Sequence, residues 1–197
     1  RSSIYAVQDN KTKQVWALKH VLRITEKDDR FIQQTEEEYA IGSKLDHPSI
    51  RRLERLIKTR KFLKTTSVSL IMELVDATTL DKRIPKNYGD IVHIFHQVAQ
   101  GLMHMHGRGF VHADMKPTNV LVLEDLSVRI IDLGQACAIG TVKPRIQGTP
   151  GYIAPEQARR GEITPQTDIY NLGAMMYWVL VREVMPTALP PSSGEGA

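Results

Sequence analysis

The chain has 197 residues, of which 42% are hydrophobic and 24% charged, and its formal net charge at pH 7 is +4. This composition is ordinary for a globular protein of one or two domains. No apolar run approaches the ~20 residues needed to span a bilayer, so we expect no membrane-spanning segment in this chain. The single Cys137 excludes an internal disulfide. It is typical of a reducing compartment, and we expect a cytoplasmic location.

Short strands are expected in the first third of the chain. Alternating apolar residues predict strands over residues 4–7 and 15–20, joined by a polar turn into a hairpin. Because side chains alternate across a strand, Ala17 and Lys19 lie on the same face of the second strand. A further strand is expected over residues 68–75.

A polar, acid-rich segment over residues 26–45 carries apolar residues near helical spacing and predicts a helix. It ends before His47-Pro48, since the residue before a proline leaves the helical region. Three consecutive acids lie on this helix, and the pattern alone is compatible with a solvated face for each of them: Glu36, Glu37 and Glu38.

Basic residues gather in the stretch that follows. No aromatic stacking pattern accompanies them, so a solvated face is a better interpretation than a nucleic-acid patch, and we expect no nucleic-acid partner. The residues are Arg51, Arg52, Arg55, Lys58, Arg60, Lys61 and Lys64.

Two long helices are expected further on. An apolar stripe predicts a helix over residues 90–107, with Asp90 as its N-cap and Gly107 as its end. Another helix begins at Pro165, with Thr164 as its N-cap.

Residues 79–84, before the first of these helices, are expected to form a short helix of their own. Histidines recur on the helix over residues 90–107, but no Cys or carboxylate has the spacing of a metal ligand beside them. We therefore expect the polar side of the helix to carry them: His93, His96, His104 and His106.

The residues that suggest chemistry lie in a polar loop over residues 112–119, enclosed by apolar runs as a loop between strands would be. The loop offers an acid, a cation and an amide, and a second acid follows the next apolar run. These are Asp114, Lys116, Asn119 and Asp132. The set suits metal-assisted phosphoryl transfer, in which carboxylates and amides hold Mg²⁺ and a cation contacts a phosphate.

Residues 112–119 resemble the catalytic loop of protein kinases, and Asp132-Leu133-Gly134 resembles the Asp-Phe-Gly motif of that family. Residues 148–156 resemble the end of the Ser/Thr-kinase activation segment. Asp168 opens a sequence similar to the start of the kinase αF helix, where the family's buried Asp ties down the catalytic-loop backbone. The chain is identified as a member of the Ser/Thr protein kinases, and its Ala-Pro-Glu-Gln sequence is most similar to bacterial members.

The resemblance implies an α+β fold of two lobes. A small antiparallel β lobe with one helix is expected over residues 1–75, a mainly helical large lobe over residues 76–188, and a flexible tail or linker over residues 189–197. Because the chain starts with Arg1 inside an expected strand, we expect a kinase domain truncated at both ends. The missing parts would be most of the Gly-rich loop and the last large-lobe helices.

The resemblance also implies a site for ATP. Ala17 would contact adenine, and Lys19 would contact the α- and β-phosphates while paired to a Glu of the first helix. The family's distance to the His-Pro sequence selects Glu38, whereas the apolar residue expected four positions after the Glu favours Glu37. The other nucleotide-binding residues would be Met72 as gatekeeper, Glu73 and Val75 through their backbones, and Leu121.

In the implied reaction, Asp114 accepts or orients the proton of the substrate hydroxyl, and Lys116 steadies the γ-phosphate. Asn119 and Asp132 hold Mg²⁺, and the hydroxyl of Thr149 bonds Asp114 and Lys116. Lysine two residues after the catalytic Asp is the Ser/Thr pattern. The implied activity is therefore transfer of the ATP γ-phosphate to Ser and Thr hydroxyls of proteins.

Two positions depart from the family pattern: Ala113 replaces the Arg of His-Arg-Asp, and Leu133 replaces the Phe of Asp-Phe-Gly. Two alternatives stay open, namely a pseudokinase or scaffold module that kept the fold, and an inactive fragment. Loss of residues equivalent to Lys19, Asp114, Asn119 or Asp132 would favour a pseudokinase, and none is lost. The sequence does not indicate an oligomeric state.

Overall fold

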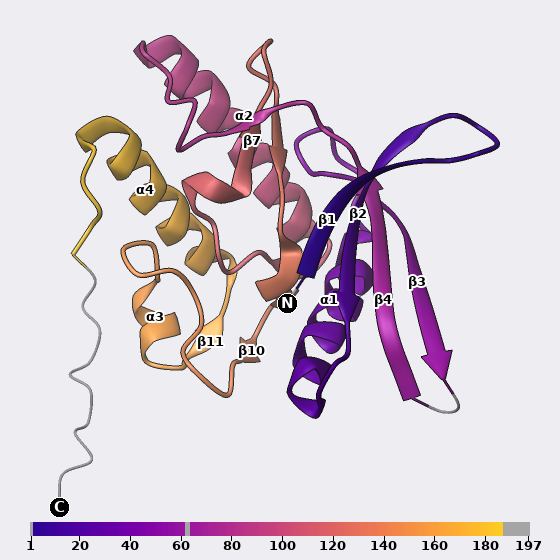
Figure 1. Ribbon diagram of the computed structural model, residues 1–197. Helices are drawn as coiled ribbons and strands as arrows, with labels where there is room; N and C mark the ends of the chain where they lie inside the picture. The colour runs from indigo at the N-terminus through magenta and orange to yellow at the C-terminus, as the bar shows by residue number, and fades with distance from the viewer. Residues whose placement is uncertain (1, 62–63, 187–197) are drawn as a thin grey trace, which may run out of the picture.

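The computed structural model describes residues 2–61 and 64–186, so the tail or linker expected over residues 189–197 lies outside the described residues. The chain begins with an antiparallel sheet of four strands in the order β1-β2-β4-β3, drawn from indigo to magenta in Figure 1. The strands are β1 (Ser2–Gln8), β2 (Val15–Leu22), β3 (Leu53–Lys61) and β4 (Lys64–Glu73).

One helix packs against this sheet. After a 3₁₀ turn, η1 (Glu26–Asp28), α1 (Asp29–Gly42) runs alongside the strands (Figure 1). Its buried positions include Ile32 and Ile41, which face the sheet strands, and Glu38 lies on the same buried side. The helix expected over residues 26–45 is therefore present and shorter at both ends.

The rest of the chain is mainly helical, with two long helices, α2 and α4, that contact each other. Short strands and turns connect and flank them (Figure 1). The helices are α2 (Tyr88–Gly107), α3 (Pro155–Ala158) and α4 (Pro165–Val181). The strands are β5 (Thr78–Thr79), β6 (Phe110–Val111), β7 (Val120–Val122), β8 (Val128–Ile130), β9 (Cys137–Ala138), β10 (Thr141–Val142) and β11 (Glu162–Ile163), and the 3₁₀ turns are η2 (Pro117–Asn119) and η3 (Leu133–Gln135).

The largest apolar core runs through both parts of the chain. It joins Leu70 of β4 to Ile94 and Leu102 of α2 and to Met175 of α4, and all four side chains are at most 1% exposed. Burial of a large apolar side chain contributes roughly 1.5–3 kcal/mol, so this shared core fixes the sheet against the helices. The expected α+β fold, a small antiparallel sheet with one helix beside a mainly helical part, is confirmed.

Two local expectations are wrong. Residues 79–84 form no helix, because Thr79 pairs with Leu121 in the β5–β7 ladder and the chain then turns. The helix expected from Asp90 begins two residues earlier, with Asn87 as the N-cap whose side chain accepts from the Asp90 N–H at 2.9 Å. No strand was expected at β3, but the expectation that its basic residues face solvent is confirmed, because all of them are exposed.

Gly42 ends α1 where the helix lies closest to the strand β3. A Cβ atom built on Gly42 would collide with the Leu53 side chain and would lie 3.1 Å from Leu133 Cδ1. Leu53 therefore fills the space that a side chain at residue 42 would otherwise occupy. Because interiors are close-packed, the absence of a side chain at this position is a packing requirement.

We expect Gly42→Leu to lower the free energy of unfolding by about 1–3 kcal/mol, since the added side chain overpacks the site. Thermal melting of the purified protein measures the loss. A matched control is Gly173→Leu, at a glycine inside α4 with no atom within 4 Å of a built Cβ, which should not destabilise. The double variant Gly42→Leu/Leu53→Ala should recover part of the loss, and losses that merely add would contradict this packing argument.

Candidate active site

The loop over residues 112–119 connects β6 to β7 and brings its acid and cation together. Lys116 Nζ lies 2.9 Å from Asp114 Oδ2. Thr149 joins this pair, because its hydroxyl donates to Asp114 Oδ1 at 2.8 Å and accepts from Lys116 Nζ at 2.9 Å. The two side chains of the loop are thus bonded to each other and to a residue more than thirty positions away.

The amide and the second acid present oxygen atoms. Asn119 Nδ2 donates to the Asp114 carbonyl at 2.8 Å, which leaves Asn119 Oδ1 as the atom available to a metal. Asp132 has a left-handed backbone, with φ of 63°, and its exposed carboxylate accepts from the Gly134 N–H at 3.3 Å. Mg²⁺ is typically bound through one or two such oxygens together with substrate phosphates. The described residues hold no cluster of three or more His, Cys, Asp or Glu that could form an all-protein metal site.

Lys19 on β2 forms an ion pair with Glu38 on α1, with 2.6 Å between Nζ and Oε2. Glu38 is 1% exposed, whereas Glu37 lies on the surface side of the helix and accepts from Gln33 at 2.8 Å. Of the two alternatives left open by the sequence, Glu38 is therefore the residue that contacts Lys19. A buried carboxylate of this kind requires a cation, so the pair also fixes α1 against the sheet.

The β2–β4 ladder determines which side chains share the face of Lys19. Ala17 pairs with Met72, so both lie on that face, and both are buried. Trp16 pairs with Glu73, so the Glu73 side chain lies on the opposite face. Of the remaining residues expected at the nucleotide site, Val75 and Leu121 are half-buried.

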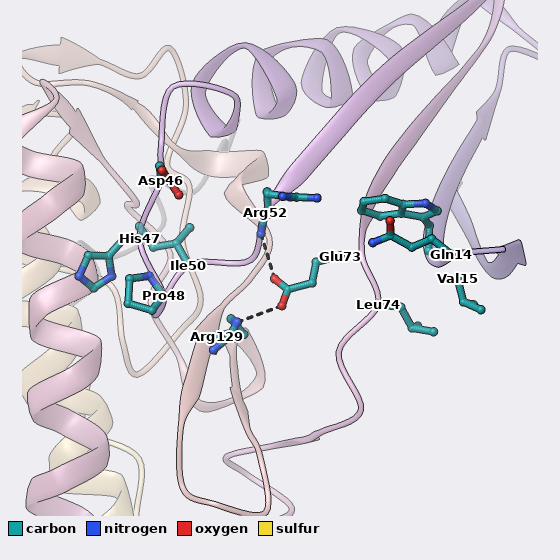
Figure 2. A pocket seen from close by; sticks show the side chains of 11 residues that line it. Gln14, Val15, Asp46, His47, Pro48, Ile50, Arg52, Glu73, Leu74 and Arg129 are labelled. Carbon is teal, nitrogen blue, oxygen red and sulfur yellow. Dashed lines mark hydrogen bonds and ion pairs between the residues drawn. The ribbon is translucent and has the colours of Figure 1, made fainter. Parts of the chain in front are cut away.

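Figure 2 shows where the Glu73 side chain goes. Its carboxylate accepts from Arg129 Nε at 3.2 Å and from the Arg52 N–H at 3.2 Å, within a cavity of about 490 Å³ that Trp16 also lines. The Glu73 N–H donates to the Arg52 carbonyl at 2.9 Å, so this N–H is not available to a ligand. The cavity lies on the face of the ladder away from Lys19.

Comparison with known proteins decides the family. Residues 1–189 match the model of the protein kinase domain. The chain belongs to the protein kinase family. Protein kinases in general use ATP and a divalent metal ion, and the expectation drawn from the sequence motifs is confirmed at this level.

Curated relatives of this kinase chain are Ser/Thr-protein kinases. It is 30% identical over 158 residues to PLK4 of Xenopus laevis, covering 76% of this chain and 16% of the relative. It is 30% identical over 178 residues to PrkC of Bacillus subtilis, covering 86% and 26%, and 28% identical over 203 residues to PknA of Mycobacterium tuberculosis, covering 98% and 46%. The chain therefore spans less than half the length of each of these relatives. No described helix combines the length and hydrophobicity needed to cross a membrane.

Asp168 of α4 holds the backbone of the loop over residues 112–119 through its side-chain carboxylate. The carboxylate is 0% exposed and accepts from the backbone N–H of His112 at 2.9 Å and of Ala113 at 2.8 Å. His106, near the end of α2, is a third partner, with Nε2 2.8 Å from Asp168 Oδ2. The expectation that His106 lies on the polar side of its helix is wrong, because the buried carboxylate draws it inward.

Of the three other histidines of α2, two face solvent and one contacts another element. His93 and His96 are exposed, as expected. His104 instead accepts from the Asp46 N–H at 3.3 Å, and its ring centroid lies 5.3 Å from that of His47. The apolar stripe of α2 gave no signal for these contacts, because each partner comes from a different element.

Cys137 of β9 is buried, and burial raises the pKa of its thiol. A raised pKa keeps the thiol protonated near neutral pH, and a thiol is a poorer nucleophile than a thiolate. The structure therefore favours the interpretation of Cys137 as a small buried residue.

Arg51 is the unexpected cation near this kinase site. The sequence placed it on a solvated face, but its Nε is buried and has no hydrogen-bond partner among the described residues. Burial lowers the pKa of the guanidinium, while the carboxylates of Glu38, Asp132 and Glu73 act in the opposite direction. Its neighbour Arg52 lies on the outer side, over the Trp16 ring. Alternation along an extended chain could have signalled that one of two adjacent arginines points inward.

We expect Arg51→Met to raise the free energy of unfolding by about 1 kcal/mol or more, because methionine fills similar space without burying an Nε–H that has no hydrogen-bond partner among the described residues. Chemical denaturation measures the change. Arg52→Met is the matched control, since this side chain is 60% exposed, and its effect should stay within about 0.5 kcal/mol. If Arg51→Met destabilised the protein more than the control, the Arg51 charge would be a net stabilising group in the folded state.

Proposed function

We propose that the protein is an ATP- and Mg²⁺-dependent Ser/Thr protein kinase, which transfers the γ-phosphate of ATP to Ser and Thr hydroxyls of protein substrates. The observation that carries the proposal is the contact set of Asp114, Lys116 and Thr149, with three distances between 2.8 and 2.9 Å. Lys116 and Thr149 hold the carboxylate of Asp114 in one orientation, as a group that accepts a hydroxyl proton requires. The cytoplasm, where ATP is abundant, is the proposed location.

ATP supplies the phosphoryl group, and Mg²⁺ on its phosphates neutralises their charge. Asp132 and Asn119 would hold the metal through carboxylate and amide oxygens. Lys19, oriented by Glu38, would contact the α- and β-phosphates. The adenine would lie against Ala17, Met72 and Leu121, and the backbones of Glu73 and Val75 would bond its polar edge, with the Glu73 carbonyl in place of its occupied N–H.

The remaining residues act on the acceptor. The substrate hydroxyl oxygen would attack the γ-phosphorus as the bond to the leaving ADP breaks, and Asp114 would receive the hydroxyl proton. Lys116 would steady the charge of the γ-phosphate, which is possible because its ammonium has donors beyond those used by Asp114 and Thr149. The Ser/Thr class is supported by Lys116 and by the names of the three relatives.

We expect Asp114→Asn to lower kcat by about 10²–10⁴-fold while leaving the affinity for Mg·ATP nearly unchanged, because Asp114 would face the hydroxyl rather than the nucleotide. Asp132→Asn should instead weaken Mg·ATP binding. Initial rates on a Ser/Thr peptide and calorimetric titration with a non-hydrolysable ATP analogue, both on the full-length protein, separate the two effects. Near-normal turnover by Asp114→Asn would remove the catalytic assignment, and a wild type that binds nucleotide without transferring phosphate would favour a pseudokinase.

We expect Thr149→Val to lower kcat by about tenfold or more, because valine keeps the shape of threonine but cannot bond Asp114 or Lys116, and both side chains would lose their fixed positions. Thr149→Ser keeps the hydroxyl and is the matched control, with activity within a few-fold of the wild type. Steady-state rates at saturating ATP test the pair. Equal activity of the two variants would show that the hydroxyl does not position the catalytic side chains.

A further inference from the structure

Gln157, on the short helix α3, has a side chain that uses all of its hydrogen-bonding capacity. It is 4% exposed. Its Nε2 donates to the Ala113 carbonyl at 2.7 Å and to the Gln147 carbonyl at 3.3 Å. Its Oε1 accepts from the Ala154 N–H at 2.9 Å and from Asn171 Nδ2 at 3.2 Å. Two donor and two acceptor bonds saturate a side-chain amide, so the orientation of the group is fixed.

Ala113, whose carbonyl accepts from Gln157, has an unusual backbone conformation. Its φ is 61°, in the left-handed region, where a non-glycine residue is strained and persists only when its surroundings hold it. Asp168 accepts from its N–H at 2.8 Å, and Gln157 donates to its carbonyl at 2.7 Å. Both sides of the strained residue are therefore held by buried side chains, and the carbonyl that Gln157 holds belongs to the peptide bond that leads into Asp114.

The same amide also bonds the segment that carries Thr149. Two of its partners, the Gln147 carbonyl and the Ala154 N–H, lie on either side of Thr149 in the chain. Asn171 of α4 contacts both the Gln157 amide and this segment, since its Nδ2 also donates to the Tyr152 carbonyl at 2.6 Å. One side chain thus connects the catalytic loop to residues 147–154, and both are held against α4.

We propose that Gln157 is a positioning residue for phosphoryl transfer, which keeps the catalytic loop and residues 147–154 in register so that Asp114 faces the acceptor hydroxyl of a peptide. This inference rests on the proposed kinase function. It assigns no contact between Gln157 and the nucleotide, so we expect the main effect of the residue on the acceptor side of the reaction.

Two substitutions distinguish the role of the two Nε2 N–H donors of Gln157 from that of the rest of its side chain. Gln157→Glu keeps size and both acceptor bonds but sets a carboxylate oxygen against the Ala113 and Gln147 carbonyls. Gln157→Leu removes all four bonds with little change in volume. Thr167→Val is the matched control in the same region. It removes the 2.6 Å bond from Thr167 to Glu156, another α3 residue, and the 3.1 Å bond that the Thr167 hydroxyl accepts from the Thr164 N–H, and neither partner belongs to the catalytic loop.

In the full-length protein, both Gln157 variants should lower kcat/KM for a Ser/Thr peptide by about tenfold or more, whereas the dissociation constant of an ATP analogue should change by no more than about twofold. Thr167→Val should lower the melting temperature with kcat/KM close to that of the wild type. Amide hydrogen exchange without nucleotide gives a readout independent of turnover. Peptides covering residues 112–119 and 147–154 should exchange faster in both Gln157 variants, and peptides from α2 should not.

The outcomes separate this inference from the proposed function. An active wild type whose turnover and exchange are unaffected by Gln157→Leu would overturn the positioning role alone. Equal loss of peptide and nucleotide affinity in Gln157→Glu, or the same loss of kcat/KM in Thr167→Val, would also overturn it, because such losses indicate general destabilisation. A wild type that transfers no phosphate to any peptide would overturn the proposed function, even if exchange at residues 112–119 still responded to Gln157.

Discussion

The buried carboxylate of Asp168 is the constraint on which the active-site geometry depends. A carboxylate that is removed from water must be compensated by hydrogen bonds, and here the compensation comes from the N–H groups of His112 and Ala113 and from the His106 ring. Asp168 lies on α4, whereas His106 lies on α2 and the other two partners lie on the loop after β6. Any displacement of the catalytic loop would leave a buried charge with fewer partners, so the loop position is coupled to the packing of α2 and α4.

A second buried carboxylate lies between α1 and the sheet. Glu38 is 1% exposed, and its partner Lys19 comes from the neighbouring sheet. One turn after Glu38, α1 packs closely at Gly42, where the Leu53 side chain of β3 occupies the space that a Cβ would fill. The ion pair and the close packing at Gly42 thus both hold α1 against the sheet.

The residue pattern by itself predicts those parts of the site whose residues are close together in the chain, and the family resemblance adds distant contacts such as that of Thr149 with Asp114. Asp114, Lys116 and Asn119 lie within one loop, and α2 and α4 follow from apolar periodicity. The residue pattern fails for β3, because an edge strand exposes most of its side chains and its basic residues hide the alternation. It also fails for contacts such as His106 to Asp168, which join residues 62 positions apart, because their partners are determined only by the tertiary fold.

The replacement of the usual arginine by Ala113 changes the kind of force that orders this loop. An arginine before the catalytic Asp can pair with a phosphate on the activation segment, which ties loop order to phosphorylation. The methyl group of Ala113 can make no such bond, and the contacts that hold this residue are made by its backbone with Asp168 and Gln157. The Gln157 amide is neutral and buried, so its bonds need no phosphate and are little affected by salt. We therefore expect the fold itself to order this loop, without a charged modification that pairs with residue 113.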